Sequence, residues 1–438
     1  MIKRNVKCLF VIVLLAISPI VGSAQEALTL EQAIEIGLKN NFDILISDKN
    51  LDIATTNNNW GNAGRYPTIS FSMKGDISPM YQKDQNMTVY SANVMANVDW
   101  VLFDGFRVKI TKQKLTDLES LSGGQASVVV EGVIRKIISA WYLARVEKEK
   151  EIVRKEMVTL SKDRYDQAKR LAEMGSKTKY ELLQAQNAWL EDQGNYLSQK
   201  VTAKNARRNL SYVMGEDSSK SIWGVQGELS AEDKDFVMAD LLDKMYHDNN
   251  NLKNQYLNQK LMVDEQGLAK SKMFPTISLN GAITESYSES SPQHPNMIPG
   301  VTTNPSVGIR LSYNIFSGGT RKRAIQVAKI NKEISDLKID DMKLSLANQL
   351  GQYYDLYDVN KSLLHLSDEQ VGAAKLNLDI SIQKLRSGAI NSFNFRDVQV
   401  MYFNAKTAQL NAIYKLQMSY VDLVTITGGV IAAYSPAK

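Results

Sequence analysis

The sequence has few of the residues that build metal, disulfide or nucleophilic sites, with one cysteine and three histidines in 438 residues. Cys8 lies in an apolar N-terminal run, so the rest of the chain can form no disulfide and offers no cysteine for a lipid anchor. His247, His294 and His365 have no partner at the spacing of metal ligands. A G-x-S-x-G elbow and a glycine-rich phosphate loop are also missing. We therefore expect no enzyme activity, no metal site and no cofactor.

Methionine is the one soft metal ligand that the chain has in number, with 16 residues. These residues are dispersed along the sequence, and methionine readily fills irregular cores. Core packing is therefore the favoured explanation, and a copper exporter is the alternative.

Residues 1–24 have the pattern of a signal peptide. Lys3, Arg4 and Lys7 precede an apolar run that ends at Ile20, and small residues follow it. The run is shorter than the roughly 20 residues of a spanning helix, and a short membrane anchor is the alternative. We expect an exported mature chain. Removal of the three basic residues lowers its formal net charge from +5 to +2, which gives no indication of nucleic-acid binding.

The remaining sequence contains two copies of one pattern. RYPTIS at 65–70 is echoed by MFPTIS at 273–278, and Gly175 is matched by Gly388. Each copy reads helix, proline, strand, loop, strand, long helix, glycine turn, helix. The offset between the copies changes in the loop between the strands, where insertions cost least. The chain then divides into a signal peptide at 1–24, a first repeat at 25–215, a linker at 216–240, a second repeat at 241–428 and a tail at 429–438.

Four segments alternate between apolar and polar residues, as strands with one apolar face do. In the last of them, Val307, Ile309 and Leu311 point one way and Arg310 the other. Several segments match or exceed the ~9–11 residues that cross a bilayer as a tilted strand. The expected strands are at about 68–76, 89–103, 276–287 and 306–316.

Three aromatic residues, Trp100, Phe103 and Phe316, stand at the strand ends where an interfacial girdle belongs. Four strands cannot close on themselves, so an exported sheet of this size has two open edges that need partners. Small closed assemblies of identical chains are the common solution. The alternative is a soluble sheet packed on its own helices, because half-buried strands alternate in the same way.

Two proline-free segments, 106–174 and 320–387, have helical periodicity and would each span about 100 Å at 1.5 Å per residue. Both contain apolar residues at the spacing of a coiled-coil seam. Gly123 and Gly124 interrupt the first segment at a cost of about 2 kcal/mol relative to alanine, so we expect a bend or break there. The seam residues are Val133, Ile137, Ala140 and Ala144 in the first copy and Leu346, Leu350, Tyr353 and Tyr357 in the second.

Short motifs occur in a fixed order along nearly the whole mature chain. They are LTLEQAI at 28–34 followed by two asparagines, prolines at 67 and 275, FDG at 103–105, FSGG at 316–319 and GSKTKYELLQAQ at 175–186. In this ordered set the chain resembles the TolC-type outer membrane efflux protein family. Two residues depart from the family pattern: Phe42 replaces a proline, and Arg396 stands where the first copy has Leu183. The second departure leaves the packing of the second tip open.

The resemblance implies an α+β membrane protein that forms a homotrimer. Three chains would contribute twelve strands to one β-barrel in the lipid of the outer membrane, continued by a hollow coiled-coil tunnel across the periplasm. Two hairpin tips per chain would meet a periplasmic adaptor protein and an inner-membrane transporter. The residues expected at these docking tips are Gly175, Ser176, Thr178, Gly388 and Asn391.

The family closes its tunnel with carboxylates six and nine residues after the second tip glycine. Here those positions hold Asn394 and Asp397, and Glu181 lies six residues after the first tip glycine. Carboxylates repeated by threefold symmetry would form an acidic ring that attracts cations at the periplasmic aperture. The alternative is that Glu181 and Asp397 are solvated acids near helix N-termini, where acids are favoured.

The expected function is a passive exit duct of a tripartite efflux system. One alternative is the outer membrane component of a type I protein secretion system, which would use the same tunnel with a different pump. An alternative of another class is a structural coiled coil or adhesin without a pore. The sequence does not indicate the substrate, because selectivity would lie in the pump.

Overall fold

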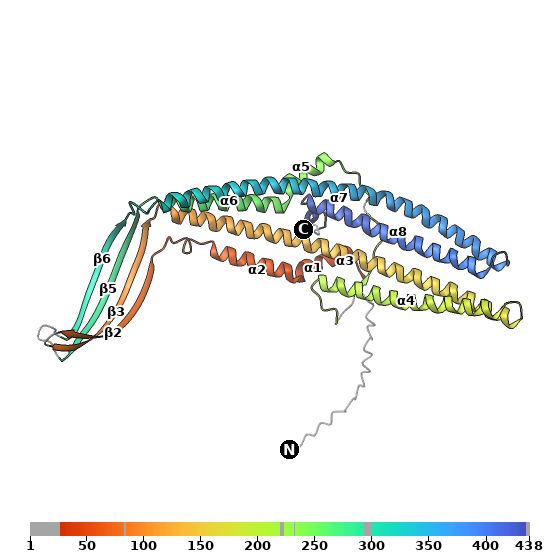
Figure 1. Ribbon diagram of the computed structural model, residues 1–438, viewed down its shortest axis with the longest axis horizontal. Helices are drawn as coiled ribbons and strands as arrows, with labels where there is room; N and C mark the ends of the chain where they lie inside the picture. The colour runs from red at the N-terminus through yellow and green to blue at the C-terminus, as the bar shows by residue number, and fades with distance from the viewer. Residues whose placement is uncertain (1–26, 83–84, 220–222, 232, 293–298, 435–438) are drawn as a thin grey trace, which may run out of the picture.

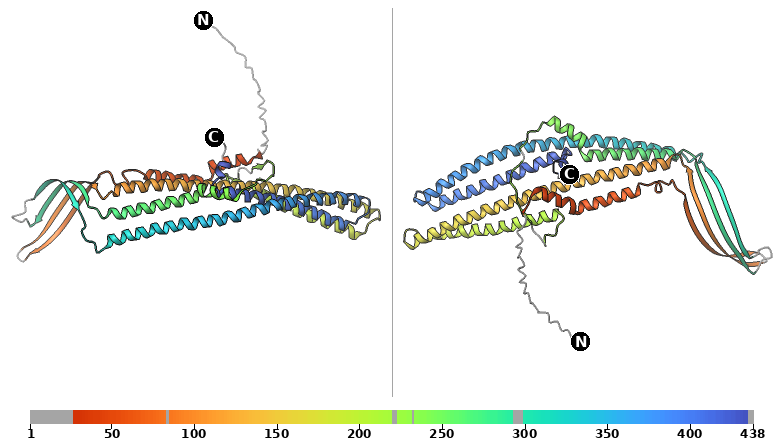
Figure 2. Two further views of the ribbon diagram at one scale, coloured as in Figure 1. Left: turned by 90° about the horizontal axis from the view of Figure 1, so that it is seen from above. Right: turned by 180° about the vertical axis from the view of Figure 1, so that it is seen from behind.

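The computed structural model describes residues 27–82, 85–219, 223–231, 233–292 and 299–434. The molecule is elongated, with a β-sheet at one end and two helical hairpin tips at the other (Figure 1, Figure 2). The predicted signal peptide at 1–24 lies outside the described residues. Within the described part of the chain, no helix is long and apolar enough to cross a membrane.

The sheet has the four strands that the sequence predicts. They are antiparallel, in the order β2-β3-β5-β6, so β2 and β6 are edge strands without a partner in the described chain. The strands are β2 (Thr68–Gln82), β3 (Gln85–Phe103), β5 (Thr276–Ser291) and β6 (Gly300–Ser312).

Strand β6 lies earlier in the sequence than the expected 306–316. It begins at Gly300 and ends at Ser312, so Phe316 is not in the strand. The reason is that β5 begins only at Thr276, directly after Pro275, and Thr276 pairs with Ser312. Among the described residues, the segment after Ser312 has no strand to pair with, and the carbonyl of Asn314 accepts a hydrogen bond from Arg321 instead. The other three strands extend further toward the hairpin turns than expected.

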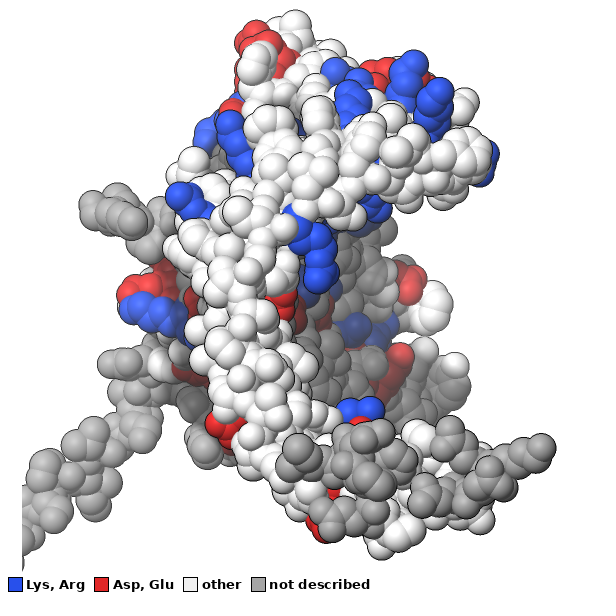
Figure 3. Space-filling view, turned by 90° about the vertical axis from the view of Figure 1, so that its left-hand side faces the viewer, with Lys and Arg blue, Asp and Glu red and all other residues white. Residues whose placement is uncertain are grey.

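The sheet has one apolar and one polar face. Ile69 pairs with Val98, and Leu279 pairs with Ile309, which places these apolar side chains on the same face. Much of this face is bare, since Val307 is 83% exposed. Figure 3 looks onto this end of the molecule, where the sheet surface carries few charged side chains. On the opposite face Ser70, Asn97, Asp99 and Asn280 form a hydrogen-bonded row across three strands.

Two pairs of long helices lead away from the sheet. Helices α3 (Arg107–Glu173) and α7 (Thr320–Arg386) have 67 residues each, and α4 (Lys179–Val213) and α8 (Ser392–Ile426) have 35 each. The predicted helical segments are therefore confirmed. The predicted seam residues are buried, except for the partly buried Tyr353, and several of them belong to one continuous core.

The break expected as one possibility at Gly123 and Gly124 is wrong, because α3 is one continuous helix through both residues. Gly124 faces Asn254 on α6 (Asn250–Ser271), and a Cβ at Gly124 would overlap the Asn254 side chain. The glycine therefore allows α3 and α6 to approach closely.

Near the middle of the rod, the two repeats share the same clamp. Asn41 caps α2 (Phe42–Asn57), and its side-chain amide donates to the carbonyl of Val213 at 2.7 Å. Asn249 caps α6, and its amide donates to the carbonyl of Ile426 at 2.8 Å. Phe42, the departure from the family pattern, is exposed just after the first clamp and leaves it intact.

Short elements complete this middle region. The predicted linker contributes β4 (Gly224–Val225), which pairs in parallel with β1 (Ala27–Leu28). The described part of the predicted tail forms a short helix that packs on the core. The helices of this region are α1 (Leu30–Asn40), α5 (Met238–Asp248) and α9 (Val430–Tyr434).

Candidate functional site

The two hairpin tips turn in the same way, through a glycine in the left-handed region. Gly175 has φ +73° and Gly388 has φ +76°. In the first tip, Gly175 N–H donates to the carbonyl of Ala172, and Ser176 N–H donates to that of Leu171. The second tip repeats both bonds. This pattern satisfies the last carbonyls of each long helix and reverses the chain within a few residues.

Each return helix begins with a side-chain cap. Thr178 Oγ1 accepts from Glu181 N–H, and the Glu181 carboxylate accepts from Thr178 N–H at 3.0 Å. That backbone hydrogen bond lowers the pKa of Glu181. In the second tip, Asn391 Oδ1 accepts from Asn394 N–H at 2.9 Å. Thr178 and Asn391, two of the residues expected at the docking tips, therefore define where α4 and α8 begin, and Glu181 acts structurally as a capping residue.

The three expected aperture residues differ in their surroundings. Asp397 and Asn394 are both exposed on the first turns of α8. Within the described residues, the Asp397 carboxylate has no hydrogen-bond or ion-pair partner, whereas Glu181 is engaged with Thr178. The structure of one chain does not bring Asp397 and Glu181 into contact.

An ion pair between the hairpins has no signature in the sequence. Arg396 Nη1 lies 2.6 Å from Asp192 Oδ2, and Nη2 lies 2.8 Å from Oδ1, which is a two-pronged ion pair between α8 and α4. Asp192 is only 2% exposed. Arg396, the departure that left the packing of the second tip open, thus connects that tip to the first hairpin. No local pattern indicates this pair, because its members are 204 residues apart.

Two further arginines lie near this ion pair, Arg154 partly buried and Arg164 buried. Arg154 lies with its guanidinium carbon 3.6 Å from the ring centre of Phe403. Arg164 is only 5% exposed, and its Nε and Nη1 have no hydrogen-bond partner in the described chain. Burial lowers the pKa of both arginines. The space between the hairpins is therefore rich in positive charge.

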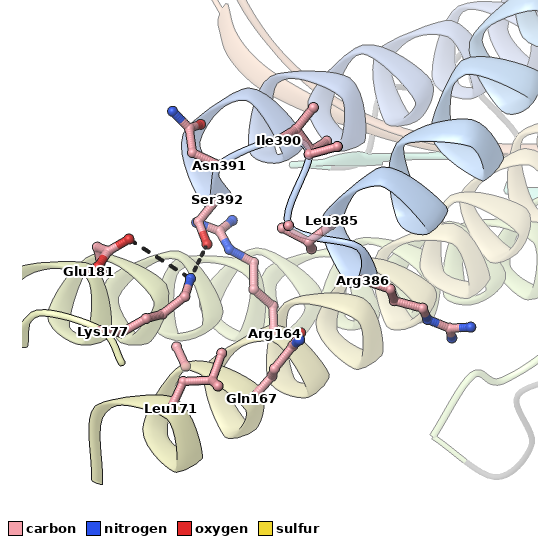
Figure 4. Close-up of a pocket in the computed structure, with 13 residues that line it drawn as sticks. Arg164, Gln167, Leu171, Lys177, Glu181, Leu385, Arg386, Ile390, Asn391 and Ser392 are labelled. Carbon is pink, nitrogen blue, oxygen red and sulfur yellow. Dashed lines mark hydrogen bonds and ion pairs between the residues drawn. The ribbon is translucent and has the colours of Figure 1, made fainter. Parts of the chain in front are cut away.

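A cavity of about 450 Å³ opens between the two tips. Figure 4 shows Arg164 reaching into it from α3 toward Ser392 at the start of α8. Lys177 approaches from the first tip and donates to Ser392 Oγ at 3.3 Å, 3.9 Å from the Glu181 carboxylate.

The predicted aromatic girdle is divided between two environments. Trp100 Nε1 donates to the carbonyl of Arg65 at 2.9 Å, and Phe103 packs edge to face with Phe106 at 5.4 Å. Both lie toward the end of β3 nearest the helices. Phe316 lies beyond the end of β6 and is 84% exposed. The role of these three residues at a membrane surface stays a prediction.

The described residues contain no group of three or more histidine, cysteine, aspartate or glutamate side chains that could hold a metal ion.

The chain is 20% identical over 419 residues to nodulation protein T of Rhizobium leguminosarum bv. viciae, a match that covers 92% of this chain and 83% of the relative.

Solved structures of outer membrane proteins share the fold. The CmeC outer membrane channel of Campylobacter jejuni superposes with a TM-score of 0.74 at 15% identity, over 91% of this chain and 85% of that one. The outer membrane protein VceC of Vibrio cholerae superposes with a TM-score of 0.71 at 11% identity, over 91% of this chain and 96% of that one.

The sequence also matches a known protein family in both of its repeats. The match covers residues 33–216 and 241–429 and is to the family described as outer membrane efflux protein. It confirms the resemblance to TolC-type proteins and the expected location in the outer membrane, with the helical part in the periplasm. The chain belongs to the outer membrane efflux protein family.

Proposed function

We propose that this chain forms the outer membrane channel of a tripartite efflux system, as a homotrimeric passive duct. The observation that carries the proposal is the sheet, which has two edges unpaired within the described part of the chain, one bare apolar face and one polar face. Unpaired edges are satisfied when identical sheets join edge to edge. Three such sheets give twelve strands, with the apolar face toward lipid and the polar row toward the lumen.

Exposed apolar residues on the rod support the same assembly. Leu337, Leu344 and Leu366 on α7 are all more than half exposed in the single chain. Long helices with a bare apolar stripe bury that stripe against another helix. Packing of neighbouring chains along α7 would cover these leucines and complete a helical tunnel.

The tips are the proposed contact with an adaptor and its inner-membrane transporter, because they are the end of the rod furthest from the sheet (Figure 1). Asp397, with Asn394 beside it, is proposed to line the aperture, and Glu181 to contribute less because it caps α4. A type I secretion component would have the same duct. Purification with the native partner proteins would distinguish the two systems.

The deciding experiment is conductance of the purified protein in a planar lipid bilayer, combined with its mass in detergent. We expect ion-conducting trimers. A monomer that conducts no ions would contradict the proposal and favour a structural coiled coil or adhesin.

A further inference from the structure

The wall of the cavity between the tips includes a buried cation, Arg164, that has no ion-pair partner among the described residues. Arg164 is only 5% exposed, and neither its Nε nor its Nη1 has a hydrogen-bond partner among the described residues. The carboxylate of Asp192, the buried acid nearby, already accepts hydrogen bonds from both Nη1 and Nη2 of Arg396. A buried guanidinium that lacks acceptors is costly, so the structure holds a donor group in need of an anion.

A second cation stands across the cavity from Arg164. Lys177 donates one hydrogen bond to Ser392 Oγ at 3.3 Å, and an ammonium group has three donors. The Glu181 carboxylate is 3.9 Å away, beyond hydrogen-bond distance, and is bonded to Thr178. Lys177 therefore keeps donor capacity for another acceptor.

The start of α8 adds a third source of positive potential. This helix has 35 residues and begins at Ser392, a residue that lines the cavity. Its first backbone N–H groups have no partner within the helix, and the Asn391 cap accepts only from Asn394. Unpaired N–H groups and the helix dipole together favour an anion at this position.

The charge lining the cavity has a positive balance. Two basic side chains, Arg164 and Lys177, and one acidic side chain, Glu181, line it. The lining also includes the exposed Arg386, whose guanidinium points away from the other three (Figure 4). The volume of about 450 Å³ is ample for an anion with several oxygens.

We propose that this cavity binds a small inorganic oxyanion of the phosphate type. The Arg164 guanidinium would donate from the unpartnered Nη1 to an oxygen of the ion, because hydrogen bonds from a guanidinium to an anionic oxygen are charge-assisted and strong. Lys177 and the start of α8 would donate to the remaining oxygens. The site joins α3, the first tip and α8, so an occupied site would hold the two tips of one chain together. This proposal does not depend on the transport function.

The test is titration of inorganic phosphate into the purified full-length protein in a phosphate-free detergent. Line broadening of the phosphorus NMR signal reports binding, and the melting temperature reports its effect on stability. We expect saturable broadening, competition by sulfate, and a rise in melting temperature with phosphate.

Arg164→Gln should weaken phosphate binding about tenfold or more, because it removes the charge-assisted donors. Lys177→Gln should also weaken phosphate binding. Because the Lys177 side chain is less buried, this variant still tests the site if Arg164→Gln fails to fold. Glu181→Gln should tighten binding by removing the one acid. Lys169→Gln is the matched control, since Lys169 is an exposed cation on the same helix outside the cavity.

Two results would overturn the proposal. One is the absence of saturable phosphate binding to the parent protein. The other is phosphate binding that is unchanged in both Arg164→Gln and Lys177→Gln, which would place the ion elsewhere on the molecule.

Discussion

Arg396 and Asp192 join the two hairpins of one chain through a pair of short, parallel contacts of 2.6 and 2.8 Å. Arg396 belongs to α8 and Asp192 to α4, which are the return helices of the second and first hairpins. Glu191 adds a longer contact of 3.6 Å to the same guanidinium. A single arginine thus makes ion pairs with two acids of the other hairpin.

Arg396→Leu, which places the first-copy residue at this position, should leave the buried Asp192 charge unpaired. We expect a loss of about 3 kcal/mol in the free energy of unfolding, measured by denaturant titration, and faster proteolysis at both tips. Combining it with Asp192→Leu should restore most of the stability, because no uncompensated charge is then buried. The exposed Arg386→Leu is the control, and an equal loss there would rule out a special role for the ion pair.

Gly175→Val and Gly388→Val should strain the tips, because both glycines have positive φ that a β-branched residue resists. A Cβ added at either glycine would meet no described atom within 4 Å beyond its chain neighbours, so the strain comes from the backbone alone. We expect trimers to assemble on native gels while efflux of a reporter dye is lost. Gly372→Val, at an exposed helical position of α7 with equal space, is the control. Failure of both tip variants to fold would show that the glycines serve the rod.

Asp397→Ala should reduce cation selectivity and relieve block by multivalent cations in single-channel recordings with unequal salt. Three exposed carboxylates around a narrow aperture would be poorly screened over a few ångströms. Glu181→Ala should change selectivity less, since that carboxylate is bonded to Thr178. Leu346→Ala should impair assembly and leave the selectivity of surviving pores unchanged. A reversal potential identical to the parent would remove Asp397 from the aperture.

Asp264 on α6 should make stability depend on pH. Burial and the neighbouring charge of Asp117 raise the pKa of Asp264 to about 6, from a usual value of 3.8. Between these values the folded chain holds a proton that the unfolded chain releases, so stability falls as pH rises from about 4 through 6. We expect a higher melting temperature at pH 5 than at pH 7.5.

Asp264→Asn should raise the melting temperature at pH 7.5 and remove most of this difference. Asp48→Asn, at an exposed position of α2, should do neither. A pH dependence that persists in Asp264→Asn would assign it to other groups.

Features with a local or repeated signature could be predicted from the sequence. The long helices follow from apolar spacing without proline, and the tip turns follow from Gly175 and Gly388, because these signals act over a few residues. Each of these signals occurs in both copies of the repeat, which strengthens the prediction. The end of β6 could not be predicted from its own alternation, because the strand stops where its partner β5 begins at Thr276.

Contacts between distant residues leave no such signal. The sequence indicates only that Gly124 lowers the stability of the helix. The structure shows that its missing side chain leaves room for Asn254 of α6. Arg164 stands in a helical pattern in which nothing indicates that its guanidinium is buried. Asp192 and Arg396 are each ordinary helix residues until the fold places them together. The candidate site between the tips consists mainly of such contacts.

The two asparagine clamps fix equivalent positions in the two repeats, and the length of each hairpin can be measured from its clamp. Asn41 and Asn249 hold the ends of α4 and α8 at equivalent places, and both return helices have 35 residues. Roughly seven residues added to each arm of one hairpin would move its tip by about 10 Å relative to the other tip. We therefore expect length changes in the rod to keep the two tips level only when both hairpins change together, whereas a change in a strand loop does not move either tip.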